Sequence, residues 1–136
     1  MNRIFEALAH ACVFAPQSVA ASTSKTSDYV DMSGVDEVEF LISTAALGEG
    51  KKLTVSLVTA DSMDGTDARV IGEAEFTDDV GTSPALAVLS YRPVAANGRY
   101  VAARFQHDAA AAVICGVTVS AGSGNLPSVN GWTLVI

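Results

Sequence analysis

Hydrophobic and polar residues alternate with a period of two along most of the chain, which is typical of strands with one buried face. The alternation is clearest over 38–42 and 53–57, where Val, Phe, Ile or Leu occupies every second position. Further strand candidates are the ranges 29–32, 68–76, 85–92, 99–106, 112–120 and 132–136. Short turns separate these ranges, and two of the turns contain Asp64-Gly65 and Asn97-Gly98, pairs that favour tight turns.

This series of short strands, with no long helical pattern between them, predicts the fold class. We expect an all-β chain that forms an antiparallel β-sandwich, jelly-roll-like in its connections, with a short N-terminal helical arm. An immunoglobulin-like order of strands is the alternative, because strand spacing alone does not determine which strands pair.

Apolar residues in the predicted arm recur with a different period from those in the rest of the chain. Its large apolar residues recur at intervals of three and four, which predicts an amphipathic helix over 2–14 that Pro16 ends. Such a short helix is marginal alone, so it packs either on its own domain or on a neighbouring subunit. We therefore divide the chain into an arm and linker, 1–26, and a β-sandwich domain, 27–136. The predicted attachment residues of the arm are Ile4, Phe5, Leu8, Val13 and Phe14.

Charge narrows the choice of partner. Fifteen acidic and eight basic residues give a formal net charge of -7 at pH 7, and the basic residues are dispersed. A chain of this charge repels nucleic acid and anionic lipid, so we expect no nucleic-acid partner, no membrane partner and a protein partner instead. Glu6 and His10 interrupt the apolar N-terminal run, so we expect a product made in the cytoplasm that keeps this segment.

Candidate reactive groups are few. Cys12 and Cys115 are far apart in sequence and are expected to be free thiols, and we expect no metal and no cofactor. His107 precedes Asp108 at a predicted turn, where a solvated His-Asp pair is expected. The acidic loop 61–67 is expected to be a solvated turn, with a non-standard calcium site as the alternative. We expect no enzyme, although a Ser-His-Asp set assembled from distant strands is a matter of geometry that sequence does not decide.

The order of several motifs resembles small head-associated proteins of tailed bacteriophages, some of which are capsid cement or decoration proteins with jelly-roll folds. The likeness covers about 29–119. The segments that carry it are Tyr29-Val30-Asp31-Met32-Ser33-Gly34, the strand 38–42, Ser62-Met63-Asp64-Gly65-Thr66-Asp67-Ala68, Ser90-Tyr91-Arg92-Pro93, Arg99-Tyr100-Val101 and Ala112-Val113-Ile114-Cys115-Gly116-Val117.

The resemblance implies a structural role and no reactive residues. It implies a virion protein on the capsid exterior that binds the major capsid protein, stabilises contacts between capsomers and self-associates as a dimer or trimer. Two alternatives stay open. One is a β-sandwich binding module for carbohydrate or a host surface, for which Trp132 is the candidate stacking residue. The other is a minor tail or adaptor protein of the same virion.

Overall fold

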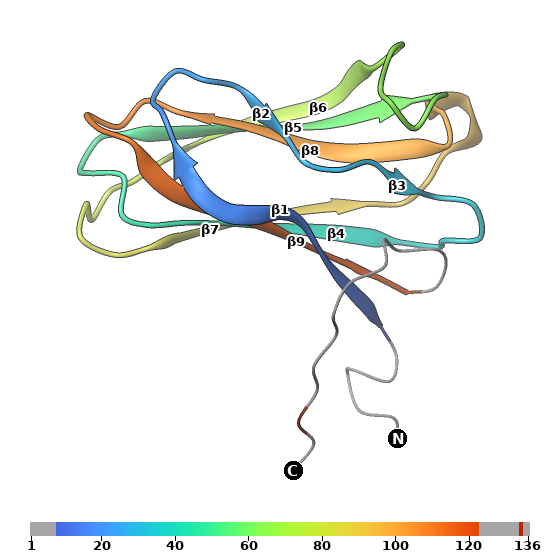
Figure 1. The fold of residues 1–136 in the computed structure, drawn as a ribbon, viewed down its shortest axis with the longest axis horizontal. Helices are drawn as coiled ribbons and strands as arrows, with labels where there is room; N and C mark the ends of the chain where they lie inside the picture. Colours follow the sequence, from blue (N-terminus) through green and yellow to red (C-terminus); the bar gives the residue numbers. More distant parts are fainter. Residues whose placement is uncertain (1–7, 123–133, 135–136) are drawn as a thin grey trace.

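The computed structural model describes residues 8–122 and 134, and it shows two layers of β-strands (Figure 1). One short 3-10 helix, η1 (Ala95–Asn97), is the helical element of the described residues. No helix in this part of the chain is long and apolar enough to cross a membrane. The strands are β1 (Ala9–Val19), β2 (Lys25–Thr26), β3 (Val30–Asp31), β4 (Val38–Thr44), β5 (Lys52–Ala60), β6 (Arg69–Thr77), β7 (Ala85–Tyr91), β8 (Tyr100–His107) and β9 (Val113–Ala121).

The strands form two antiparallel sheets whose order is that of a jelly roll. Sheet A has the order β1-β9-β4-β7, and sheet B has the order β2-β8-β5-β6, with β3 also paired to β8. Counting β2 and β3 as one interrupted strand, the first strand pairs with the last, the second with the next to last, and so on inward to β5 and β6. This rolled ribbon is the jelly-roll connection and excludes the immunoglobulin-like alternative.

The prediction of an all-β sandwich is confirmed. The six strands predicted between residues 38 and 120 are β4 to β9, and the weak candidate at 29–32 contains β3. In β4 the alternating residues Val38, Phe40 and Ile42 are fully buried, as the pattern predicts. The core lies between the two sheets, where the rings of Phe14 and Phe105 meet edge to face with centroids 5.2 Å apart. This pair joins β1 of sheet A to β8 of sheet B.

The predicted N-terminal helix is wrong for the described residues, because residues 9–19 form strand β1. Ala11 and Val13 point into the core and are buried, while Cys12 between them is exposed. The inward positions are filled partly by alanine, which carries little hydrophobic signal and favours helices in isolation. Pairing with β9, about a hundred residues later, overrides that local preference.

The predicted attachment residues therefore have different positions. Val13 is buried and Phe14 packs against the core, so these two stabilise the fold and are not a free contact surface. Leu8 precedes β1 and borders a shallow hollow beside Glu37 and Glu39. The predictions for Ile4, Phe5 and, except for Leu134, the strand at 132–136 with Trp132 fall outside the described residues.

The linker predicted over 17–26 is also part of the sandwich. Its first residues, up to Val19, belong to β1, and the range 25–26 is β2, paired with β8. Residues 9–26 therefore contribute strands to both sheets instead of forming an arm apart from them.

Candidate functional site

The two histidines occupy different environments, and one of them contradicts the prediction made from its sequence. His10 is exposed on β1, with Nδ1 2.8 Å from the Ser120 hydroxyl. His107 is 1% exposed and is not part of a solvated pair. Its Nδ1 accepts a hydrogen bond from the Ala109 N–H (3.1 Å), so its Nε2 carries the proton and donates to the Val19 carbonyl (2.7 Å). Both ring nitrogens are occupied by backbone groups, so His107 joins the two sheets and is not placed to act as a base.

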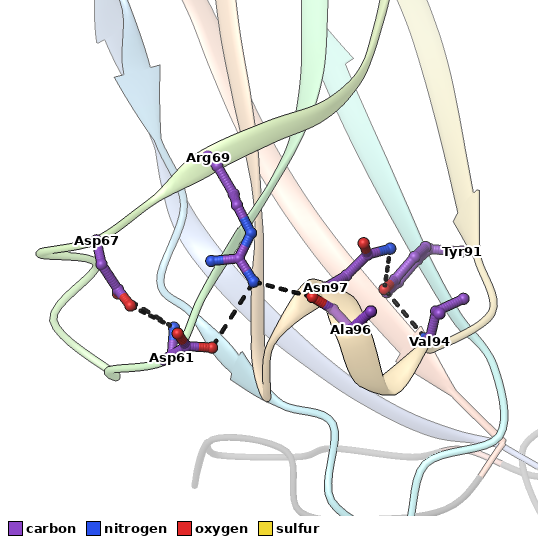
Figure 2. Close-up of polar contacts among 7 residues, drawn as sticks. All are labelled: Asp61, Asp67, Arg69, Tyr91, Val94, Ala96 and Asn97. Carbon is purple, nitrogen blue, oxygen red and sulfur yellow. Dashed lines mark hydrogen bonds and ion pairs between the residues drawn. The ribbon is translucent and has the colours of Figure 1, made fainter.

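The acidic β5–β6 loop is organised by its own backbone. The Asp67 carboxylate accepts the Asp61 N–H at 3.1 and 3.2 Å, as Figure 2 shows. The Asp64 carboxylate accepts hydrogen bonds from the hydroxyl and the backbone N–H of Thr66, and this contact lowers the pKa of Asp64. Arg69 lies 3.7 Å from the remaining carboxylate, that of Asp61. These carboxylates hold a turn together, which is the arrangement expected of a structural loop.

The neighbouring β7–β8 loop is tied to the same end of the sandwich. Figure 2 shows the Arg69 guanidinium donating to the Ala96 carbonyl at 3.2 Å. The Tyr91 hydroxyl accepts hydrogen bonds from the Val94 N–H (3.3 Å) and from the Asn97 side-chain amide (3.2 Å). These contacts tie the β5–β6 and β7–β8 loops to each other and fix the conformation of the β7–β8 loop.

At the opposite end, Asp78 links the β6–β7 loop to the β4–β5 loop. Its carboxylate accepts backbone hydrogen bonds from four N–H groups, which lower the pKa of Asp78, the contact from Gly81 (2.7 Å) most of all. The other three donors are Leu47, Gly48 and Val80. Gly81 has a φ of +80° and lies against the Glu49 backbone, where a Cβ atom would clash.

The described residues offer no metal site. They contain no group of three or more His, Cys, Asp or Glu placed to hold a metal ion. Cys115 is buried, which raises its thiol pKa, while Cys12 is exposed on β1. Desolvation keeps Cys115 protonated, so it behaves as a small apolar side chain.

The outer face of sheet B is charged. Its side chains come from alternate positions of β5, β6 and β8, and they include Lys, Arg and Glu. Toward the β5–β6 loop, the outer residues Val58, Ala60 and Ala102 are buried and Val70 is 48% exposed, so the polar part of this face is the other half of the sheet. Its polar contacts are Lys52 Nζ with Glu75 Oε1 (3.2 Å), Ser56 Oγ with Glu73 Oε2 (3.2 Å), and Arg104 Nε with Thr26 Oγ1 (3.4 Å).

The outer face of sheet A is the opposite. We call its central part the uncharged face, which consists of Cys12, Leu41, Ser43, Leu86, Val88, Ile114, Gly116 and Thr118. The register places Cys12, Thr118, Leu41 and Val88 in one row that crosses all four strands. Leu86, Val88 and Ile114 are 62%, 50% and 53% exposed. Charged groups of this sheet gather at one end, where Arg92 and Ser90 contact Glu37.

A kink in β1 shapes this face. The register of β1 against β9 shifts on both sides of Phe14, and Pro16 lies over Gly116, where a Cβ atom would come within 3.3 Å of the proline ring. A hollow of about 230 Å³ results, bordered by Cys12, Pro16 and Ile114. An exposed apolar face with such relief is typical of a protein contact surface.

Sequence reasoning missed the uncharged face, although one signal for it was present. In β7, Leu86 and Val88 occupy the positions at which an exposed face normally shows polar residues, so the strand is apolar at both parities. Half of the other residues of the face are Ser43, Gly116 and Thr118, which look ordinary in an exposed position. Only the strand order shows that they lie beside the exposed Leu, Val and Ile.

Comparison with solved structures supports the fold. The PBSX exported protein XepA superposes with a TM-score of 0.60 and 13% identity, covering 94% of this chain and 42% of XepA, so this chain spans less than half of that protein. The subunit of the disulfide-linked pili of Bacillus endospore appendages gives a TM-score of 0.50 with 14% identity, covering 84% of this chain and 86% of the subunit.

The infectious bursal disease virus structure gives a TM-score of 0.48 with 10% identity, covering 88% of this chain and 33% of that one. No protein-family model matches the chain, and no curated protein matches it. At these identities the likeness to the first two structures shows the fold alone, and together with the strand order it defines the class as a jelly-roll β-sandwich.

Proposed function

We propose that this chain is a structural virion protein, a cement or decoration protein that binds the major capsid protein on the outside of a phage head. The observation that carries the proposal is the uncharged face of sheet A. An acidic chain that exposes Leu86, Val88 and Ile114 on one sheet, and charges on the other, has one face suited to a protein partner. The fold likeness to an exported protein of phage PBSX agrees with this role.

The physical requirements of a cement protein suit this surface. Such a protein binds in many copies, so each contact needs only modest affinity and the repeated lattice supplies avidity. An apolar sheet face with small polar residues contributes contact area without burying unpaired charge, which would oppose binding. Ile4 and Phe5 keep their predicted role as additional contacts. Val13 and Phe14 do not, because they pack in the core.

Binding to capsid shells tests this proposal. A glutamate in the uncharged face, Thr118→Glu, should reduce co-sedimentation with shells of the parent phage at least about tenfold, because it places a charge in a desolvated contact. The matched control is Gln106→Glu, which makes the same residue on the exposed outer face of sheet B and should bind like the wild type. Equal loss in both variants, or none in either, would contradict the assignment of sheet A as the shell-binding face.

A second candidate is a fibre subunit, and two observations favour it. This chain covers 86% of a subunit of disulfide-linked pili, and Cys12 is exposed on the edge strand β1. In that case oxidation of the purified chain by air should join two chains through a Cys12–Cys12 disulfide, these dimers should associate further into fibres, and reductant or Cys12→Ser should abolish the fibres. Capsid binding that is indifferent to reductant and to Cys12→Ser would favour the cement role instead.

A further inference from the structure

We propose that strand β7 pairs with β7 of a second copy across a two-fold axis, joining two A sheets into one continuous eight-stranded sheet. This inference concerns self-association and does not rest on capsid binding. It starts from the free edges of the two sheets. β7 pairs with β4 on one side, and no described strand pairs with its other side. Its unpaired backbone groups are a template for a further strand.

Three other edges are protected in ways that natural sheets use against pairing. In β1, Pro16 lacks a backbone donor and the register shifts twice. The edge formed by β2 and β3 is interrupted, and each piece is two residues long. β6 contains a bulge and carries Arg69, Glu73 and Glu75. Charge, irregularity and shortness each discourage an incoming strand.

The β7 edge has none of these protections. Its seven residues pair with β4 without a register shift and contain no charge and no proline. A regular, uncharged edge of this length is able to accept a strand along its whole extent. Because the other three sheet edges are protected against pairing and the β7 edge is not, β7 is the edge that can accept a partner strand.

The incoming strand is best supplied by β7 itself. An antiparallel pair centred on Val88 sets Val88 opposite its own copy, Leu86 opposite Ser90 and Ala87 opposite Leu89. No charge is brought near a like charge within this pair, although the chain carries a net charge of -7. The β6 strand of a second copy would present Glu73 and Glu75, and β1 would present Pro16. A two-fold contact of this kind also closes on itself.

A crevice beside the edge gives the partner strand a second contact. It has a volume of about 310 Å³ and lies where β6 and β7 meet at the open side of the sandwich, lined by Leu53, Phe76, Leu86 and Val88 among others. Phe76 is 47% exposed there. A strand added to β7 would place its inward residues over this crevice and cover the exposed ring, adding apolar burial to the backbone hydrogen bonds.

Sedimentation velocity over a wide concentration range tests the proposal. The wild type should form a dimer, and Val88→Lys should weaken it at least about tenfold because two lysines meet on the axis. Val88→Glu should do the same, and an equimolar mixture of the Lys and Glu variants should recover a heterodimer. Val88→Thr, a neutral β-branched control, should dimerise nearly as well as the wild type.

Further variants distinguish pairing at the β7 edge from association through the rest of the uncharged face. Ile114→Lys changes an equally exposed residue of the same face, in the central strand β9, and should leave the dimer intact. Circular dichroism checks that each variant folds, and Leu86→Lys replaces Val88→Lys if that variant does not. A monomeric wild type at every concentration, or a dimer lost in Ile114→Lys and retained in Val88→Lys, would overturn the proposal. Capsid binding by Thr118→Glu is read separately, so either proposal can fail alone.

Discussion

The two sheets share one core and differ in what they show to solvent. Sheet B displays paired charges such as Lys52 with Glu75, whereas the centre of sheet A displays Leu86, Val88 and Ile114 among small uncharged residues. A sheet of a soluble protein needs one polar face, and sheet B meets that expectation while sheet A does not. The difference teaches that overall composition conceals how charge is distributed here, because an acidic chain keeps its charges off the centre of one face.

The free edges repeat the same contrast on a smaller scale. β6 and β7 lie next to each other at the open side of the sandwich and line one crevice. β6 is bulged and charged, while β7 is regular and uncharged. The side chains that would discourage a partner thus belong to sheet B and are absent from the neighbouring edge of sheet A. Whether this contrast extends into the core, the joints and the loops can be measured.

The largest effects are expected in the core, where the two sheets should be equivalent. Phe40 in sheet A and Phe105 in sheet B are 0% and 1% exposed. Phe40→Ala and Phe105→Ala should each lower the free energy of unfolding by about 3–5 kcal/mol, measured by urea denaturation, because each leaves a large cavity. A cost confined to one of the two substitutions would show that the sheets differ in more than their outer faces.

A smaller loss is expected at the polar joint between the sheets. His107→Phe keeps a ring of similar size but removes the contacts to the Val19 carbonyl and the Ala109 N–H. Each buried group left without a partner should cost roughly 1–3 kcal/mol in urea denaturation. His10→Phe, at an exposed position of β1, is the control and should change stability little. An unfolding free energy equal to that of the wild type in His107→Phe would mean that the joint is held by packing alone.

The stability that Asp78 contributes by anchoring two loops should depend on pH. The folded-state pKa of Asp78 lies below its ordinary value of 3.8, so its contribution is present above that value and is lost as pH falls through the folded pKa. Asp78→Asn should therefore lower the melting temperature at pH 7. Below about pH 4, the melting temperature of this variant should fall less steeply with pH than that of the wild type. Asp79→Asn removes the same charge one residue away and should leave the acid profile of the wild type. Parallel profiles for the wild type and Asp78→Asn would disprove this role.

The same features explain which parts of the fold and of the candidate site could be predicted from the sequence. Most strands from 38 to 120 were predictable because mainly apolar residues alternate on their buried face, whereas β6 has no buried residue and was indicated by the turns on either side of it. β1 was not predictable, because its inward positions include Ala11 and its conformation depends on pairing with β9. The uncharged face left one local signal, the apolar residues at both parities of β7, but its extent depends on the spatial order β1-β9-β4-β7, which local patterns do not encode. The prediction of a solvated His107–Asp108 pair was wrong because a position near a predicted turn does not show whether the side chain is buried.

The smallest effect on stability is expected where sheet B is most unlike sheet A. Glu73→Gln with Glu75→Gln removes the carboxylates that face Ser56 and Lys52 on the outer face. Because the Lys52–Glu75 pair is exposed to solvent and a glutamine can still accept the hydrogen bond from Ser56, the free energy of unfolding should change by less than about 1 kcal/mol. The same double variant should associate more readily at high concentration, because it removes charge from the edge strand β6. Sedimentation and urea denaturation of one sample measure both quantities. A large loss of stability without any gain in association would mean that these carboxylates stabilise sheet B and do not prevent association at its edge. The charge difference between the two sheets would then not be evidence that sheet A is the contact face.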